Sequence, residues 1–304
     1  MLDQAHRILA ADRAGAGSPG ESRMIWVNGE QQRLDGPHVS AFDRGLTLAD
    51  GVFETMHVRE GTAFRLDRHL ARVAQALTAL AIPAVPDLPA WVVNALRSAT
   101  GEMSLRLTVT RGVAAGGVAP PSHASPTVII ALNPMPHFPD STYNPGLNVH
   151  IASGRRNEHA ATAGLKTLAY PDAVLALIEA HRAGADDALF LDTEGHCSEA
   201  SSSNLFMWSG GELVTPPLSC GALPGITRAT ILELAETLGV SCVERPFGLE
   251  QLLRAEEAFL TGSLRQIAPI ARIGNVLLGN GAPGRFTRQI SLAYRTRLTS
   301  ECSR

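Results

Sequence analysis

The feature that most constrains the fold of this chain is a proline-rich break near its middle. Three prolines fall within the six residues 134–139, and Asn144-Pro-Gly146 follows shortly after. Proline donates no backbone hydrogen bond and interrupts both helices and inner strands, so regular structure is expected on either side of the break rather than across it. The expected organisation is an N-terminal extension (1–23), a small N-terminal α/β domain (24–135), a linker (136–147) and a large C-terminal domain (148–304).

Hydrophobic periodicity predicts alternating strands and helices on both sides of the break, which indicates an α/β (α+β) fold in two lobes. In the first lobe the expected strands are 24–27, 53–58, 63–66, 104–110 and 126–132, with a helix that Asp67 caps and another over 88–99. In the second lobe the expected strands are 188–191, 205–208, 258–261 and 267–273, and the expected helices are 171–183, 225–238 and 286–298. Pro171 at a first helical turn and Gly184 past the end mark one of these helices.

Composition excludes several classes of protein. A chain of 304 residues with 45% hydrophobic and 18% charged residues is globular. The formal net charge of -3 gives no electrostatic footprint for nucleic acid. The four cysteines and ten histidines are dispersed, so neither a disulfide framework nor a metal site is expected. No apolar run is long enough to span a bilayer, and 1–23 lacks a signal core, so a cytoplasmic protein is expected.

Lysine is almost absent from the sequence. Of 26 Lys and Arg residues, only Lys166 is a lysine. Arginine can replace lysine wherever a solvated charge suffices, but not where a deprotonatable amine is needed. Lys166 lies among apolar neighbours in Gly-Leu-Lys-Thr-Leu, which favour a neutral amine able to form a Schiff base with a carbonyl. Alternatively, this side chain merely snorkels from a core-facing strand.

Three further segments can be interpreted chemically or structurally. Glu199, in a serine-rich bend, could hold a proton on a cofactor ring nitrogen or be a solvated loop residue. The segment Gly221-Ala-Leu-Pro-Gly-Ile-Thr-Arg228 opens a helix and could seat a phosphate on free backbone amides, or be an ordinary turn. The loop Thr261-Gly-Ser-Leu264 could add hydroxyl and N–H donors for such a phosphate. Apart from these segments, Arg72 could supply the charge opposite the phosphate or lie on a solvated helix face.

Together these segments resemble the fold-type IV pyridoxal-phosphate enzymes, also called class IV aminotransferases, from about Met24 to Ile273. This group holds branched-chain and D-amino-acid aminotransferases, (R)-amine transaminases and 4-amino-4-deoxychorismate lyase. The matching segments occur in the family's order and are 43–55, 69–72, 164–168, 184–195, 199–206, 215–217, 223–228 and 257–263 with Pro269.

The resemblance implies a pyridoxal 5'-phosphate enzyme with a smaller N-terminal α/β lobe and a larger C-terminal lobe built on a pseudo-barrel sheet. It implies a homodimer as well. Lys166 would be the Schiff-base lysine and proton shuttle, and Glu199 would pair with the pyridine nitrogen. The other cofactor-binding residues would be Arg72, Ile226, Thr227 and Ser263 around the phosphate, with Ser201, Ser202 and Leu264 close by.

The substrate is less sharply indicated. Phe53, Thr55, Arg106 and Tyr170 are expected to bind it, and Thr55 with Arg106 is similar to the lyase pattern. The loop after Gly112 lacks the arginine common in lyases and D-amino-acid enzymes. The expected function is therefore ping-pong transfer of an amino group from an amino acid (branched-chain or D) or an amine to a 2-oxo acid. The alternatives are aminodeoxychorismate lyase and a catalytically silent binding protein on the same fold.

Overall fold

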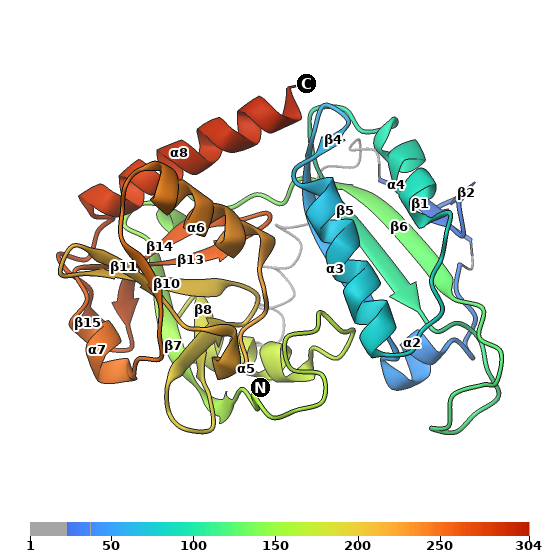
Figure 1. Cartoon of the computed structure of the whole chain (residues 1–304), viewed down its shortest axis with the longest axis horizontal. Helices are drawn as coiled ribbons and strands as arrows, with labels where there is room; N and C mark the ends of the chain where they lie inside the picture. Colours follow the sequence, from blue (N-terminus) through green and yellow to red (C-terminus); the bar gives the residue numbers. More distant parts are fainter. Residues whose placement is uncertain (1–22, 37, 304) are drawn as a thin grey trace, which may run out of the picture. The chain divides into compact units, whose positions relative to one another are not determined.

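The computed structural model describes residues 23–36 and 38–303, and Figure 1 shows its secondary structure. The chain divides into two compact units. One runs to Phe138 and includes the last residues from Cys302 onward, and the other spans Pro139–Glu301. The expected N-terminal extension lies, apart from Arg23, outside the described residues. Within the described part of the chain, no helix combines the length and the hydropathy needed to cross a membrane.

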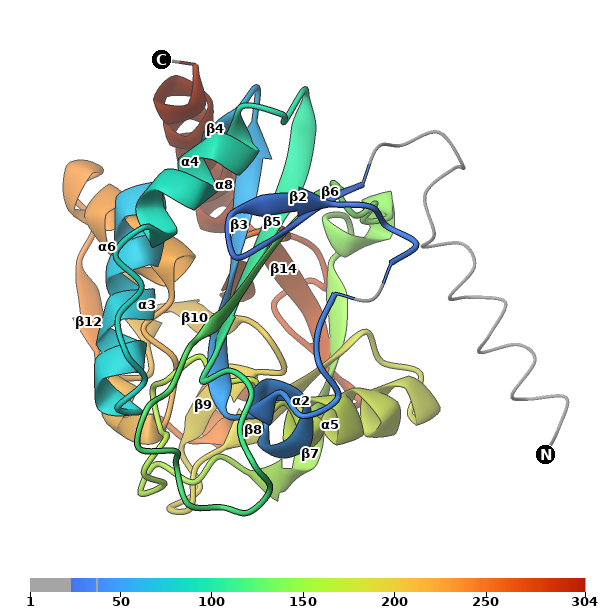
Figure 2. The same ribbon diagram turned by 90° about the vertical axis from the view of Figure 1, so that its right-hand side faces the viewer.

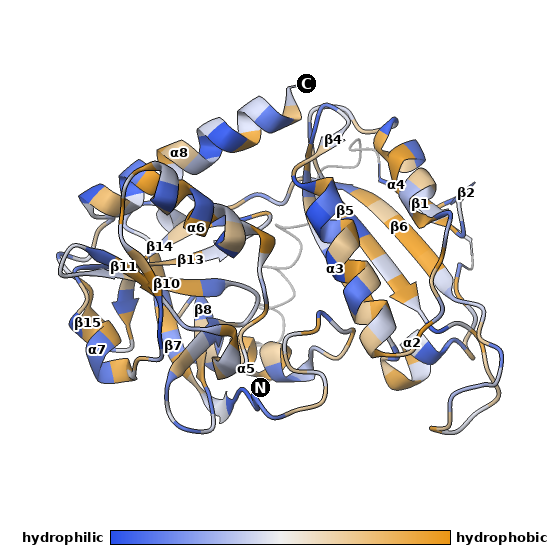
Figure 3. Ribbon diagram, viewed as in Figure 1, coloured by the Kyte–Doolittle hydropathy of each residue, from blue (hydrophilic) through white to orange (hydrophobic). Residues whose placement is uncertain are grey.

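The first unit is built on a six-stranded antiparallel sheet in the order β2-β1-β6-β5-β3-β4. Its strands are β1 (Met24–Val27), β2 (Glu30–Gln32), β3 (Gly51–Arg59), β4 (Thr62–Ala63), β5 (Glu102–Thr110) and β6 (Thr127–Pro134). Helices α3 (Leu66–Ala79) and α4 (Leu88–Leu96) cover one face of this sheet, and the short α2 (Arg44–Leu48) precedes β3 (Figure 2). Strand β6 is largely apolar (Figure 3), whereas β5 alternates polar residues with the buried Met103, Leu105, Leu107 and Val109.

The expected cap of the first helix and the expected strand before it are wrong. Helix α3 begins at Leu66, and its N-cap is Arg65, which takes a left-handed conformation with φ 56°. Asp67 therefore lies inside the first turn, where its carboxylate interacts favourably with the helix dipole but does not cap the helix. The expected strand over 63–66 is shortened for the same reason, because β4 ends at Ala63 before the chain turns into the helix.

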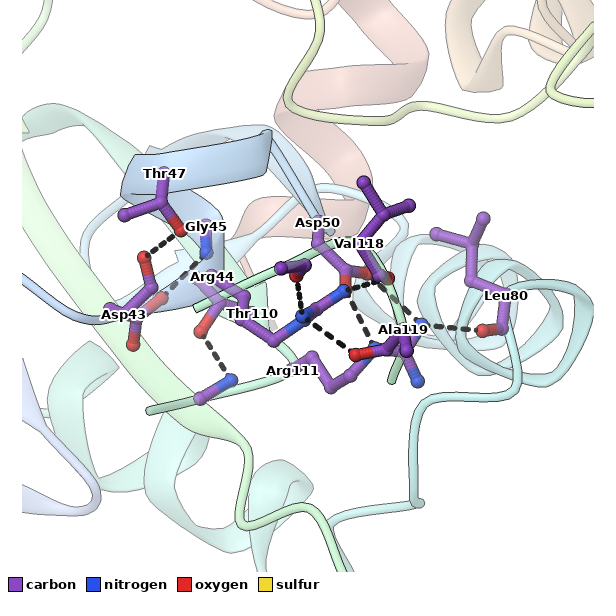
Figure 4. A network of polar contacts seen from close by, with 12 residues as sticks. Asp43, Arg44, Gly45, Thr47, Asp50, Leu80, Thr110, Arg111, Val118 and Ala119 are labelled. Carbon is purple, nitrogen blue, oxygen red and sulfur yellow. Dashed lines mark hydrogen bonds and ion pairs between the residues drawn. The ribbon is translucent and has the colours of Figure 1, made fainter. Parts of the chain in front are cut away.

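A buried ion-pair network fixes the glycine-rich loop that follows β5 (Figure 4). The Asp50 carboxylate accepts hydrogen bonds from Arg44 Nε at 2.8 Å and Arg111 Nε at 2.7 Å. Arg44 also donates to three carbonyl oxygens of the loop, those of Gly117, Val118 and Ala119, at 3.0, 3.0 and 3.2 Å. The loop is thus held through its backbone by a cation from α2.

The second unit contains a nine-stranded sheet that curls into a barrel. Its strands are β7 (Leu147–Arg155), β8 (Asp187–Leu191), β9 (Cys197–Ala200), β10 (Asn204–Ser209), β11 (Glu212–Thr215), β12 (Cys242–Glu244), β13 (Glu257–Gly262), β14 (Gln266–Ile273) and β15 (Val276–Leu277). Strands β10, β13, β14, β7, β8 and β9 are neighbours in that order, and pairing of β9 with β10 closes the ring. The closed ring confirms the barrel-like sheet expected from the resemblance.

Apolar side chains fill the barrel. Leu189, Leu205, Leu260 and Ala268, one from each of four strands, are completely or almost completely buried in its interior. The helices and short 3-10 turns of this unit are α5 (Pro171–Arg182), α6 (Ile226–Thr237), α7 (Leu249–Leu253), α8 (Arg285–Cys302), η1 (Asp140–Thr142) and η2 (Leu218–Cys220). Helix α6 packs on β12 and β13, and α5 packs on β7 and β8. The site described below lies on the outer surface of the ring, beside α6.

Candidate active site

A row of three polar side chains lies where the barrel closes. Asn204 is the direct cross-strand partner of Glu199 on one side and of Thr261 on the other. Directly opposed residues of antiparallel strands project from the same face of a sheet. Leu205 and Leu260, the next residues along, belong to the barrel interior, so the alternation of side chains places Asn204 and Thr261 on the outer face. The Thr261 hydroxyl is buried there and has no hydrogen-bond partner among the described residues.

Glu199 is a buried carboxylate held on both of its oxygens. Oε2 accepts hydrogen bonds from the backbone amide of Leu223 at 2.9 Å and from Asn204 Nδ2 at 3.3 Å. Oε1 lies 3.0 Å from a guanidinium nitrogen of Arg156, whose guanidinium carbon also lies over the Phe190 ring, 4.7 Å from its centroid. Burial raises the pKa of Glu199 above its usual value, although Arg156 and the Leu223 amide oppose the shift. A cationic N–H partner would stabilise this anion further, and the carboxylate has lone pairs left to accept one.

The N-terminus of α6 forms the second part of the site. Its N-cap is Gly225, which supplies no side-chain cap, so the amides of Ile226 and Thr227 point outward at the positive end of the helix. Position 225 has room only for glycine, because a Cβ atom there would lie 2.0 Å from Asn204 Oδ1. Asn204 Nδ2 also donates to the Leu223 carbonyl at 2.9 Å. One side chain therefore ties the helix entry to the Glu199 carboxylate.

Lys166 lies in the loop between β7 and α5 and is half-buried. Its Nζ donates to Tyr170 Oη at 3.2 Å, and Tyr170 immediately precedes α5. The charge on Lys166 is near enough to lower the pKa of Glu199, against the larger effect of burial. The second unit thus brings together the predicted amine and the predicted carboxylate, which are 33 positions apart in sequence (199 − 166).

The other predicted cofactor residues of this unit occupy two loops. The Ser201 hydroxyl donates to Asp187 Oδ1 at 2.6 Å, and Arg265 binds the other oxygen of this fully buried aspartate at 2.6 Å. Asp187 therefore ties the loop after β9 to the turn between β13 and β14. That turn holds Ser263 and Leu264, which are half-buried, whereas Ser202 is exposed.

Four predicted residues lie in the first unit. Phe53 and Thr55 project from the face of β3 opposite to Glu54, and Arg106 of β5 is the direct partner of Thr55. The Arg106 guanidinium lies 3.9 Å from the centroid of the Phe53 ring. Arg72 is on α3 and binds Glu54 through Nε at 2.6 Å and a second nitrogen at 2.8 Å. Their assignments to substrate and phosphate stay predictions.

The sequence interpretation missed three important partners of the site. Arg156, Asn204 and Asp187 each orient a predicted residue. Asn204 was part of a matching segment but received no role. Its place opposite Glu199 across a tight bend was the available signal. Arg156 gave no signal, because 25 arginines are scattered along the chain.

The donor set of the second unit fits a planar cofactor with a basic ring nitrogen, a carbonyl and a phosphate. The buried carboxylate of Glu199 would pair with such a nitrogen, the primary amine of Lys166 would attack the carbonyl, and the uncapped amides at the start of α6 would suit the phosphate. The unpartnered Thr261 hydroxyl adds a buried donor beside them.

Comparison with known proteins agrees with this fit. The sequence model of the family described as amino-transferase class IV matches residues 51–273. The branched-chain-amino-acid aminotransferase of Escherichia coli K12 is 30% identical over 292 residues, covering 91% of this chain and 93% of the relative.

Two solved structures are also similar. The crystal structure of 4-amino-4-deoxychorismate lyase from Pseudomonas aeruginosa has 34% identity and a TM-score of 0.81, covering 90% of this chain and 98% of that one. The PLP-bound form of a hypothetical aminotransferase from Mycobacterium tuberculosis has 26% identity and a TM-score of 0.81, covering 91% of this chain and 99% of that one.

Proposed function

Because the chain belongs to the class IV aminotransferase family, an enzyme family that uses pyridoxal phosphate, we propose that it transfers an amino group from an amino acid or amine to a 2-oxo acid. When bound, the cofactor supplies an electron sink for the charge that develops as the substrate α-carbon loses its proton. The buried Glu199 carboxylate, held by Arg156 and the Leu223 amide, is the observation that supports this role most directly.

Different residues of the chain hold the ring proton, attach the cofactor, move the substrate proton and bind the phosphate. Glu199 holds a proton on the ring nitrogen, and its burial keeps competing water away from that contact. Lys166 is the only side chain able to supply a neutral primary amine, so it attaches the cofactor and carries the substrate α-proton. The Ile226 and Thr227 amides, the Thr227 hydroxyl and Ser263 bind the phosphate. Ser201 is oriented by Asp187 beside them.

The attachment site is tested by borohydride reduction of the protein with pyridoxal phosphate, followed by peptide mass spectrometry. One adduct is expected, on Lys166. Lys166→Arg keeps the charge and should give none, because guanidinium does not provide a neutral amine. The matched control Arg254→Lys adds an amine on an exposed helix end and should still be labelled at Lys166 alone. Reduction without any adduct on Lys166 would favour the silent binding protein instead.

For the amino donor, we propose a branched-chain amino acid. The relatives that carry this name and the apolar ring of Phe53 beside Arg106 support the choice. A panel of L-amino acids, D-amino acids and (R)-amines, with 2-oxoglutarate and pyruvate as acceptors, measures it. Steady turnover with L-leucine, L-isoleucine and L-valine is expected. Turnover with D-amino acids or (R)-amines alone would contradict the branched-chain assignment while leaving the transaminase assignment intact.

Aminodeoxychorismate lyase is the second candidate, and a specific observation favours it. Thr55 and Arg106, the two residues that resemble the lyase pattern, are direct cross-strand partners. Such a pair could hold a substrate carboxylate beside a hydroxyl. Steady formation of 4-aminobenzoate and pyruvate from aminodeoxychorismate, without any 2-oxo acid acceptor, would select the lyase over the transaminase.

We also propose that the enzyme is a cytoplasmic homodimer with separate folding domains at 24–135 and 148–304. The family resemblance supports the dimer, and the four free cysteines suit a reducing compartment. Sedimentation of the purified protein tests the dimer directly, and a monomer over the working concentration range would contradict it.

A further inference from the structure

Away from Glu199, three side chains of different chemistry meet at one end of the barrel. Asp192 and His196 lie on the turn between β8 and β9, and Cys220 ends η2. One ligand atom from each of the three lies within 4.8 Å of the other two. We propose that Asp192, His196 and Cys220 form a structural binding site for one zinc-like divalent metal ion.

The distances suit tetrahedral coordination. His196 Nδ1 lies 3.2 Å from Asp192 Oδ2. Bonds of about 2.0 Å to nitrogen and oxygen and about 2.3 Å to sulfur place tetrahedral ligand atoms about 3.3–3.5 Å apart. The Asp192–His196 pair already has this separation, and the Cys220 sulfur, within 4.8 Å of both residues' ligand atoms, would complete three ligands by moving to the same separation. Carboxylate, imidazole and thiolate together are the ligands that zinc accepts, whereas magnesium and calcium prefer oxygen alone.

The carboxylate is already oriented as a metal ligand usually is. Asp192 Oδ1 accepts hydrogen bonds from the backbone amides of Glu194 at 3.0 Å and His196 at 2.7 Å. These bonds fix the carboxyl group and direct Oδ2 toward the imidazole and the thiol. Metal-bound carboxylates are commonly held by such second hydrogen bonds. An aspartate that only caps the turn would accept the same two hydrogen bonds, so the experiment below has to distinguish metal binding from capping.

Acidic groups surround the three side chains. Cys220 and Asp192 are almost completely buried. Burial, a hydrogen bond with Asp192 and the negative charges of Asp192, Glu158 and Glu194 raise the pKa of the Cys220 thiol, so an ion that binds there has to displace the thiol proton. Glu194 is exposed, and its Oε2 lies 3.6 Å from His196 Nδ1. The Glu194 carboxylate or a water molecule can complete four ligands. A transition-metal ion would offset this concentration of negative charge.

The position of the site gives the ion a structural role. Cys220 is three residues before Leu223, whose amide binds Glu199, and His196 is three residues before Glu199 itself. An ion held by both segments would fasten the η2 loop to the β8–β9 turn and limit movement of the Glu199 pocket. This inference does not depend on which reaction the enzyme performs. Spacings of four and 24 positions (196 − 192 and 220 − 196) match no common zinc sequence pattern, so the sequence predicted no metal.

Cobalt(II) provides the probe, because tetrahedral cobalt absorbs strongly in the red part of the spectrum, where protein and pyridoxal phosphate do not. Tag-free holoenzyme is dialysed against a chelator and titrated with cobalt chloride under a thiol-free reductant. We expect saturation at one equivalent per chain and displacement of cobalt by zinc. Cys220→Ser and His196→Gln should each weaken cobalt binding at least about 10-fold. Cys302→Ser, which removes a buried thiol outside the cluster, should leave it unchanged.

Thermal melting curves distinguish a variant that no longer binds metal from a variant that no longer folds. Zinc should raise the melting temperature of the wild type and of Cys302→Ser but not of His196→Gln, whose half-buried ring can be replaced without loss of core packing. Absence of tetrahedral cobalt bands in the wild type would overturn the proposal. Bands of equal intensity and affinity in both ligand variants would overturn it as well, because the metal would then lie elsewhere.

Discussion

Glu199 and Asn204 are joined twice, as backbone partners across the closing strands of the barrel and through a 3.3 Å hydrogen bond between their side chains. Because the two residues belong to adjacent strands, the carboxylate takes its position from the sheet rather than from a loop. Asn204 also donates a hydrogen bond to the Leu223 carbonyl and so links the carboxylate to the start of α6. The following predictions test this arrangement and two features of the first unit.

Arg156→Met should weaken the enzyme most at low pH. Burial raises the pKa of Glu199, and Arg156 is the strongest opposing charge, so its removal should raise that pKa further. Glu199 is active when ionised, and activity is therefore lost as pH falls through its pKa. The acidic limb of the kcat profile should move to higher pH, with about 100-fold lower kcat at neutral pH. The neighbouring exposed Arg155→Met is the control, and an equal shift there would contradict the assignment.

Gly225→Ala should damage cofactor binding through sterics alone. The added methyl would lie 2.0 Å from Asn204 Oδ1, so either the helix entry or the amide must move. Overpacking of this kind costs about 1–3 kcal/mol, which corresponds to about 10–100-fold in the dissociation constant of pyridoxal phosphate. Gly248→Ala, where a Cβ meets nothing within 4 Å, should bind the cofactor normally in the same fluorescence titration.

Glu54→Gln should lower the stability of the first unit in a pH-dependent way. Burial raises the pKa of Glu54, but hydrogen bonds from His69 and Arg72 outweigh it and lower the pKa from 4.5 to about 2. The ionised group therefore stabilises the fold fully above about pH 4.5, by about 3 kcal/mol, and this contribution disappears as pH falls toward 2. Urea unfolding at several pH values should show the variant's deficit shrinking in that window.

The control for this prediction is Glu30→Gln on the exposed edge strand β2, which should change stability little at any pH. A deficit in Glu54→Gln that stays constant down to pH 2 would contradict the ionic origin of the effect.

Arg44→Met should loosen the glycine-rich loop without unfolding the sheet. Arg44 holds three successive carbonyl oxygens of residues 117–119, and a thioether cannot donate to them. Hydrogen exchange of peptides over 113–125 should become at least about 10-fold faster, while peptides of β5 and β6 stay protected. Arg33→Met, which removes only an exposed pair with Asp35, serves as the control. Unchanged exchange in the loop would refute this anchoring role.

Local signals carried much of the prediction. Pro171 and Gly225 mark the starts of α5 and α6. The fixed φ of proline suits the first turn of a helix, and a glycine leaves the start of the helix open, so both positions can be recognised in the sequence. Lys166 stands out in the composition because it is the only lysine among 26 Lys and Arg residues. Strand β7 is harder to predict, although Leu147, Val149 and Ile151 alternate with polar residues, because the proline-rich linker next to it obscures the pattern.

Long-range relationships account for the rest. Arg156 reaches Glu199 across 43 positions (199 − 156), and Asp187 meets Arg265 across 78. Such contacts depend on how strands are ordered in the ring, which no local pattern encodes. The same holds for Asn204, whose partners on both sides are set by strand pairing.

Closure of the ring depends on strand pairings at very different sequence distances. The strands between β10 and β9 include segments as distant as β7 and β14, so the bridge at Glu199 completes a circle that spans most of the second unit. Strands β9 and β10 are joined by a short bend and can pair locally, whereas β7 pairs with β14 across 123 positions (270 − 147). A partly folded chain can therefore contain the Glu199–Asn204 pair without the closed ring that holds it in place. Acquisition of cofactor colour during refolding should therefore lag behind secondary structure. It would report the long-range pairings that complete the ring.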